Sequence, residues 1–398
     1  MGNTRTLILS RADDEPMPWM PTDTMSLRSE FVQLAQQEGR CFRTLCQRFG
    51  ISPKTGYKWC ARYQADQPLS LSDQSRRPLH SPTRTAAAMQ QLLLQLRQQH
   101  PTWGGRKLQR RLLDLGHTEV PAPSTITGIL RRHGLITPQA SEQAQPWLRF
   151  EHAQPNALWQ IDFKGYFETV AQRCHPLTLL DDHSRFNLTL SACARTDSGT
   201  VQGYLQQVFA RYGLPARINA DNGAPWGSPR EASHGISILS IWLIRLGITV
   251  SHSRPGHPQT NGKEERFHRT LKADLLNGRT FRNLAQTQQA FDAWRTVYNE
   301  QRPHQALGMA TPISHYQASP IALPARLPPI EYGPDDHVVD VGWNGWIRFQ
   351  GRDIKVSNAL HRLPIALRPD PLLDGVFDLY FCHQCFDRID LNQIEPSH

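Results

Sequence analysis

One stretch of the chain, residues 256–272 with the sequence GHPQTNGKEERFHRTLK, constrains the fold most strongly. Its first half indicates a Gly/Pro/Asn loop and its second half indicates a helix. Thr260 or Asn261 can cap that helix, and no helix breaker follows Gly262 until Gly278. We therefore expect a loop that runs directly into a charged helix.

This helix has two different faces. Positions i, i+4 and i+7 form a charged face that contains Glu265, Arg269 and Lys272. Positions i, i+4 and i+8 form an apolar face that contains Phe267, Leu271 and Leu275. The helix can dock on a core and still present one carboxylate flanked by cations. Such a surface suits a metal ion and a phosphate group.

The charge of the chain indicates a polyanionic partner. Its 398 residues leave room for about two to four domains, and a hydrophobic content of 39% is sufficient for a core. The formal net charge is +9. Residues 51–150 carry 14 Lys and Arg against 5 Asp and Glu, a net of 14 − 5 = +9. The basic excess therefore lies in the first part of the chain.

The seven cysteines have no regular spacing, which is typical of reduced thiols in a cytosolic protein. No signal peptide is expected, because Asp13, Asp14 and Glu15 interrupt the N-terminus. No apolar run is long enough to cross a membrane. We expect a cytoplasmic protein.

Residues 25–64 predict three helices with helix-turn-helix spacing. Ser52 can cap the third helix, residues 53–64, and Pro53 fits its first turn. The DNA contacts predicted on this recognition helix are Lys54, Thr55, Lys58 and Arg62. A small protein-binding domain is the alternative, and the basic third helix favours DNA.

Residues 83–137 predict a second helix-turn-helix or winged-helix-like unit, in which residues 116–122 form a turn or a small wing. Ser124 is expected to cap its last helix. The DNA contacts predicted here are Arg106, Lys107, Arg110, Ser124, Arg131 and Arg132. A solvated charged face is the alternative, and two such units in tandem make it less attractive.

From Leu158 the pattern changes to three strands, followed by strands that alternate with helices. This order predicts an α/β domain with a mixed sheet. Residues 336–392 show short β-type runs separated by turn residues, which predict a small SH3-like β-barrel.

Three acids fall at structurally marked positions in the α/β domain. Asp162 lies in the first strand, Asp221 ends a later strand in NADNG, and Glu265 opens the charged helix. Three converging carboxylates would repel one another unless cations lay between them. Two divalent ions about 4 Å apart would relieve that repulsion and hold a phosphodiester. Oxygen ligands favour Mg²⁺ or Mn²⁺.

The segments WQID, NADNG and HPQTNGKEERFHRTLK resemble the three catalytic motifs of DDE transposases and retroviral integrases. The resemblance is greatest to bacterial insertion-sequence transposases with an integrase-type core. It covers residues 156–316 and implies an RNase H-like fold. The family's pattern Asn/Gln-Gly-x-x-Glu selects Glu265, and we expect Glu264 to point elsewhere.

The resemblance also implies roles for neighbouring residues. Lys272 matches a position that contacts the terminal DNA in integrases, Asn222 lies beside the second acid, and Arg269 shares the charged face. Two departures stand out. The segment between the second and third acids is long, with residues 224–237 as an extension, and helix-turn-helix units replace the integrase zinc module.

Two other clusters are interpreted more plainly. Asp181, Asp182 and His183 predict a turn between two strands. Cys382 and Cys385 form a CxxC pair, but no second pair lies nearby in the sequence, so zinc is not expected.

The resulting hypothesis is a bacterial, nucleoid-associated transposase that binds the terminal inverted repeats of an insertion sequence. It would use two Mg²⁺ or Mn²⁺ ions for 3′-end cleavage and strand transfer, as a homodimer or a higher oligomer. A catalytically silent DNA-binding regulator and an RNase H-like nuclease are the alternatives, and the sequence leaves a helper ATPase open. The predicted order is a disordered N-terminus (1–24), the first helix-turn-helix domain (25–64), a linker (65–82), the second such domain (83–137), a linker (138–155), the catalytic core (156–316), a Pro-rich linker (317–334) and the β-barrel (335–394).

Overall fold

The structure is a computed structural model. It describes residues 23–63, 71–73, 84–136, 152–227, 236–252 and 262–395. The chain divides into two compact units between Arg84 and Thr85, and each is described by itself. None of the described helices is long and apolar enough to cross a membrane.

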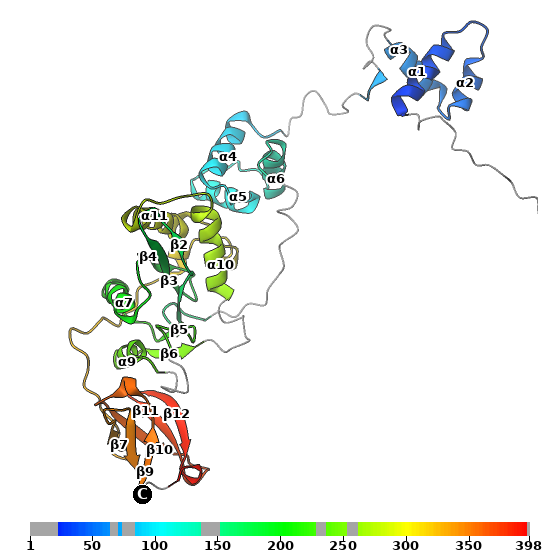
Figure 1. Ribbon diagram of the computed structural model, residues 1–398. Coiled ribbons are helices and arrows are strands. Elements are labelled where there is room, and N and C mark those ends of the chain that lie inside the picture. The colour runs from blue at the N-terminus through cyan, green and yellow to red at the C-terminus, as the bar shows by residue number, and fades with distance from the viewer. Residues whose placement is uncertain are drawn as a thin grey trace, which may run out of the picture. The chain divides into compact units, whose positions relative to one another are not determined.

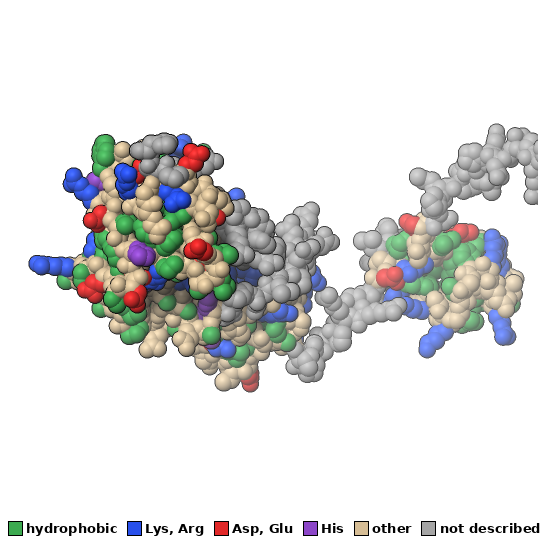
Figure 2. All heavy atoms as spheres, turned by 90° about the horizontal axis from the view of Figure 1, so that it is seen from below, with side chains coloured by type: hydrophobic (Ala, Val, Ile, Leu, Met, Phe, Trp, Pro, Cys, Tyr) green, Lys and Arg blue, Asp and Glu red, His purple; other side chains and the backbone are tan. Residues whose placement is uncertain are grey.

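The first unit contains three helices, α1 (Thr24–Ala35), α2 (Phe42–Arg48) and α3 (Pro53–Arg62) (Figure 1). Phe31, Val32, Leu45 and Trp59 are buried between them. The Thr55 N–H donates to Ser52 Oγ at 3.2 Å, so Ser52 caps α3 as predicted. Lys and Arg side chains lie on the face of this unit that Figure 2 shows.

The second unit begins with three more helices, α4 (Ala87–Gln99), α5 (Gly105–Asp114) and α6 (Pro123–Arg132). Their core includes Trp103, Leu108 and Ile126, and each such burial stabilises the fold by about 1.5–3 kcal/mol. The predicted cap at Ser124 is wrong. Ala122 is the cap residue, because Pro123 suits the first helical position and needs no N–H partner there. Residues 116–122 contain no described strand, so a turn replaces the possible wing.

A six-stranded mixed sheet follows. Its strands are β1 (Trp159–Phe163), β2 (Phe167–Glu168), β3 (Arg173–Asp181), β4 (Asn187–Cys193), β5 (Arg217–Ala220) and β6 (Thr249–His252). The order is β2-β3-β1-β5-β6, with β4 paired to β3. The β1–β5 and β5–β6 pairs are parallel, and the pairs that involve β3 are antiparallel. The predicted mixed sheet is confirmed.

Helices cover both faces of this sheet. They are α7 (Ser198–Tyr212), α9 (Ile238–Arg245), α10 (Gly262–Leu271) and α11 (Leu284–Thr296). Alternate residues of β3 divide between the two layers, as strand geometry requires. Leu177 and Leu179 pack in the cluster of α7 and α9, whereas Cys174 and Leu180 pack in the cluster of α10 and α11.

Helices α10 and α11 each continue into a π-helical turn, over Lys272–Leu276 and Val297–Gln301. The Asn277 N–H donates to the Lys272 carbonyl at 2.8 Å, and the Arg302 N–H donates to the Val297 carbonyl at 2.8 Å. The sequence predicted no interruption of the first of these helices, because no helix breaker lies between Gly262 and Gly278. A π turn shifts the register of the side chains that follow it.

The C-terminal region forms a four-stranded sheet in the order β12-β11-β10-β7 and a separate β8–β9 pair. Its strands are β7 (His337–Asp340), β8 (Trp346–Phe349), β9 (Arg352–Lys355), β10 (Pro364–Pro369), β11 (Val376–Phe381) and β12 (Gln384–Asp390). The predicted closed SH3-like barrel is not confirmed, because β8 and β9 pair with each other and do not join the larger sheet among the described residues. Gln384 hydrogen-bonds both the N–H and the carbonyl of Val250 in β6.

Candidate active site

Two aspartates lie near each other, one in strand β1 and one directly after the neighbouring parallel strand β5. In the ladder between β1 and β5, Gln160 is the partner of Asn219. Asp162 follows Gln160 by two residues, and Asp221 follows Asn219 by two residues. Because side chains alternate along a strand, both carboxylates project from the same face of the sheet.

The turn after β5 fixes the backbone at Asp221. Its carboxylate Oδ1 accepts the Gly223 N–H at 3.0 Å, which closes the turn predicted at Asn222 and Gly223. The carbonyl oxygen of Asp221 accepts a hydrogen bond from His252 Nδ1 at 2.8 Å. The side chain of Asn222 is exposed, so a ligand can reach it.

The electrostatics of the pair favour a bound cation. Burial, and then the nearby charge of Asp221, raise the pKa of the Asp162 carboxyl to about 7, against a smaller opposing effect of the Phe163 N–H. The Asp162 side chain is 29% exposed, so a ligand can reach it. The donor set is all oxygen, which fits Mg²⁺ or Mn²⁺.

Helix α10 has the two faces expected from its spacing. Phe267, Leu271 and Leu275 are buried, and Glu265, Arg269 and Lys272 are exposed. Among the described residues, no three His, Cys, Asp or Glu side chains come close enough to hold a metal ion. The structure therefore brings Asp162 and Asp221 together and leaves the Glu265 carboxylate apart from them.

Glu264 does not point away from the site as expected, and it is 2% exposed. Its Oε2 lies 3.1 Å from Thr178 Oγ1, which also lies 3.0 Å from the Asp162 carbonyl oxygen and 2.9 Å from His268 Nε2. Burial and the charge of Asp162 raise the pKa of the Glu264 carboxyl well above its usual value. Glu264 precedes Phe267 by three residues, so the apolar periodicity could have placed it on the buried face.

Two basic residues, His268 and Lys164, lie close to Asp162 in space or in sequence. His268 Nδ1 lies 3.9 Å from Asp162 Oδ2, and burial and the charge of Lys164 lower the pKa of this histidine to about 4. Burial, and then the charge of Lys272, lower the pKa of Lys164. Lys164 and His268 were not among the site residues predicted from the sequence. Both follow an acid of the site at short spacing, which was the available signal.

The DNA contacts predicted in the first unit lie on α3. Lys54 and Lys58 are exposed, and the Lys58 ammonium lies 4.6 Å from the centre of the Trp59 ring. The guanidinium of Arg62 lies 5.5 Å from the same ring. The Thr55 hydroxyl shares a hydrogen bond of 2.9 Å with Ser52, so it belongs to the helix cap.

The DNA contacts predicted in the second helical unit are mostly solvent-accessible. Arg106, Arg110, Ser124, Arg131 and Arg132 are exposed, whereas Lys107 is half-buried. Arg110 forms a salt bridge of 2.8 Å with Asp114. Its charge is therefore partly compensated.

The second acidic cluster forms a buried turn, as its sequence indicated. Asp181 accepts hydrogen bonds from the Asn156 N–H at 2.7 Å and from the Ser184 N–H at 2.8 Å. Asp182 forms an ion pair with Lys263, which anchors the first turn of α10 to the sheet. Cys382 and Cys385 belong to no group of three metal-ligating side chains in the described part of the chain.

Comparison with protein families gives matches along most of the chain. Two models described as an integrase core domain match residues 152–258 and 246–312. A helix-turn-helix domain matches residues 28–78, and a homeodomain-like domain matches residues 55–130. The C-terminal domain of the IS481 transposase family matches residues 336–396.

The individual proteins that match this chain have low sequence identity to it. An uncharacterized protein of insertion element IS476 from Xanthomonas euvesicatoria is 27% identical over 61% of this chain and 68% of its own length. The transposase of insertion sequence IS904 from Lactococcus lactis is 30% identical over 41% of this chain and 62% of its own length. The catalytic core of HTLV-2 integrase, solved with magnesium, is 18% identical with a TM-score of 0.30, covering 42% of this chain and 99% of that chain.

These matches account for the order of the parts observed here: helix-turn-helix domains, an integrase core with a mixed sheet, and a β-rich C-terminal region. The chain therefore contains an integrase core domain and a region similar to the IS481 transposase C-terminal domain, and its homologues are insertion-sequence transposases and retroviral integrases.

Proposed function

We propose that the chain is a DNA transposase. It binds the terminal inverted repeats of an insertion sequence, cleaves the 3′ ends and transfers them into target DNA. The observation that carries this proposal is the pairing of Asp162 with Asp221 within an integrase core domain, where their mutual repulsion calls for divalent cations.

Asp162, Asp221 and Glu265 are the proposed ligands of two Mg²⁺ or Mn²⁺ ions. Such ions, when bound, neutralise charge on the attacking and leaving oxygens of a phosphodiester. Asp162 and Asp221 already share one face of the sheet. Glu265 is on the exposed face of α10, where it can join them when DNA engages that face.

The chain's own cations position the DNA. The charge of Lys272 lowers the pKa of Lys164, and Lys164 follows Asp162 by two residues, so the two lysines supply positive potential close to the proposed position of the scissile phosphate. Arg269 and Lys272 extend this potential along α10, and Asn222 adds an exposed amide beside the second acid. These groups hold the DNA end against the two carboxylates.

The chemistry consists of two displacements at phosphorus. In the first, water attacks the phosphodiester at the element's end, and the bond to the 3′ oxygen breaks to leave a 3′-OH. In the second, that 3′ oxygen bonds to a phosphorus of the target strand, and the bond from this phosphorus to the target's own 3′ oxygen breaks. No covalent protein–DNA intermediate is required. Both transposon ends must be held together, so we propose a homodimer or a higher oligomer.

The test is incubation of the full chain with duplex DNA that carries the sequences flanking its own gene. We expect a Mg²⁺-dependent nick that leaves a 3′-OH, and a loss of at least about a hundredfold in the Asp221→Asn variant. Wild-type turnover by that variant would refute the proposal. Binding without nicking would indicate a regulator, and cleavage of RNA–DNA hybrids instead would indicate an RNase H-like nuclease.

The adjacent glutamates provide a matched pair for the third ligand. Glu265→Gln should lose cleavage, whereas Glu264→Gln should keep it, because a buried amide can still bond Thr178. The opposite result would transfer the role of third acid to Glu264. Thermal unfolding of both variants in the absence of metal controls for loss of folding.

A further inference from the structure

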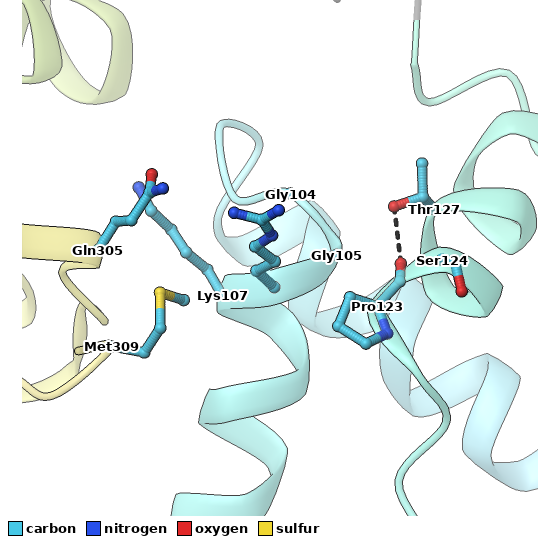
Figure 3. A pocket seen from close by; sticks show the side chains of 9 residues that line it. Gly104, Gly105, Lys107, Pro123, Ser124, Thr127, Gln305 and Met309 are labelled. Atoms are coloured by element: carbon cyan, nitrogen blue, oxygen red, sulfur yellow. Dashed lines mark hydrogen bonds between the residues drawn. The ribbon is translucent and has the colours of Figure 1, made fainter. Parts of the chain in front are cut away.

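A cavity of about 630 Å³ lies where the helical unit of α4–α6 meets the integrase core. Three segments line it: the start of α5, the start of α6, and core residues after α11. The lining residues are Gly104, Gly105, Arg106, Lys107, Pro123, Ser124, Thr127, Gln305 and Met309. Figure 3 shows Lys107 reaching from α5 toward Gln305 of the core.

The backbone at this cavity is shaped by the absence of side chains. A Cβ on Gly105 would lie 2.4 Å from the Pro123 carbonyl oxygen and 2.6 Å from Thr127 Oγ1, so only glycine lets α5 start this close to α6. A Cβ on Gly104 would meet nothing within 4 Å, which means that this side is open. A long chain molecule can therefore approach the backbone here.

The charged residues that line the cavity are all basic. Arg106 and Lys107 line it, and none of the described lining residues is acidic. Burial, and then the neighbouring Arg302 and Arg266, lower the pKa of the Lys107 ammonium to about 8, against an opposing effect of Asp274. Neither α5 nor α6 has a side-chain cap at its first turn, so their first N–H groups add to the positive potential.

The contacts around the cavity hold the two parts together. Asp274, in the π turn after α10, bonds Thr102 of the helical unit and forms a 2.7 Å salt bridge with Arg302 of the core. Arg111 of α5 donates to Gln301 Oε1 at 3.2 Å. A ligand in the cavity therefore touches both the helical unit and the core segment that follows α11.

We propose that this cavity binds a backbone phosphate of the transposon-end DNA, so that one strand crosses the junction between the helical unit and the core. The inference rests on the proposed function. A polyanion suits the site better than a free phosphate ion, because the exposed Arg131 and Arg132 add positive charge on the same helical unit. The contact would link recognition of the end to placement of the cut.

The test measures affinity of the full chain for its own flanking DNA over a range of salt concentrations. Lys107→Gln should weaken binding about fivefold to tenfold and reduce the slope of log K against log [salt] by about 0.9, the value for one phosphate. Lys107→Arg should keep the wild-type slope. Arg106→Gln, at an exposed residue, is a second variant that leaves the fold intact.

Arg211→Gln is the matched control, because this exposed arginine of α7 does not line the cavity and should behave as wild type. If wild type binds and cuts but both cavity variants keep its slope, the phosphate site is refuted while the proposed function stands. If wild type neither binds nor cuts, the function itself fails. Stabilisation by inorganic phosphate alone, lost in Lys107→Gln without any change in DNA binding, would show a free-anion site and also overturn the proposal.

Discussion

Replacement of Asp162 by Asn should stabilise the metal-free protein at pH 8. The carboxylate is held beside Asp221 in a largely buried position, which raises its pKa from 3.8 to about 7. The folded protein must therefore ionise an unfavourably placed group above pH 7. Asn has a similar shape and no charge, so it removes this cost.

The size of the effect follows from the pKa. Each unit corresponds to about 1.4 kcal/mol, so the shift gives up to about 4 kcal/mol at pH 8. Between pH 4 and pH 7 the folded protein keeps a proton that the unfolded chain has lost. The free energy of unfolding of the wild type should therefore fall as pH rises through this window and level off above it. In the Asp162→Asn variant, the free energy of unfolding should lack the part of this decrease that Asp162 causes.

The assay is thermal unfolding in EDTA at pH 5, 6, 7 and 8, where 1 kcal/mol corresponds to about 2–4 °C for a domain of this size. Asp353→Asn, at an exposed position of β9, is the control and should show no gain. Added Mg²⁺ should stabilise the wild type and not the Asp162→Asn variant. A variant no more stable than wild type at pH 8, or equally stabilised at pH 5, would refute the reasoning.

Three further predictions concern the helical units. Gly105→Ala should destabilise the α5–α6 pair by about 1–3 kcal/mol in thermal unfolding, because its Cβ would overlap the Pro123 carbonyl, whereas Gly104→Ala should be nearly neutral; equal effects would contradict this packing. Ser52→Ala should cost about 1 kcal/mol by removing the cap of α3, and an unchanged melting temperature would argue against that cap. Affinity for DNA should fall as pH rises above 8, where the free Lys107 loses its proton, and a Lys107→Arg variant should show a flatter profile; identical profiles would exclude Lys107 as the titrating group.

Local pattern was sufficient to predict much of the fold. The spacing of Phe267, Leu271 and Leu275 predicted the buried face of α10, and the order of strands and helices predicted a mixed sheet. Features set by pairing between distant segments were not accessible in this way. Strand β12 has the polar sequence QCFDRID and forms through its pairing with β11, and closure of a barrel depends on such pairings.

In the candidate site, too, local pattern predicted some features, and contacts between distant segments set the others. Motif and strand position identified Asp162 and Asp221, and the register between β1 and β5 sets them next to each other. Glu264 was expected to point elsewhere because the family's pattern selects Glu265, although its helical position places it among apolar residues. Its burial depends on Thr178, which lies opposite Asp162 on β3 and is 86 residues away in sequence.

The side chain of Gln384 has a consequence for how copies of this chain can assemble. Strand β6 is at one end of the strand order, where unpaired backbone groups invite a strand from another molecule. Gln384 occupies the N–H and the carbonyl of Val250 at 2.8 and 2.9 Å, so an incoming strand must first displace this amide. One residue of the C-terminal sheet thus hinders the pairing of a strand from another molecule with the edge strand β6.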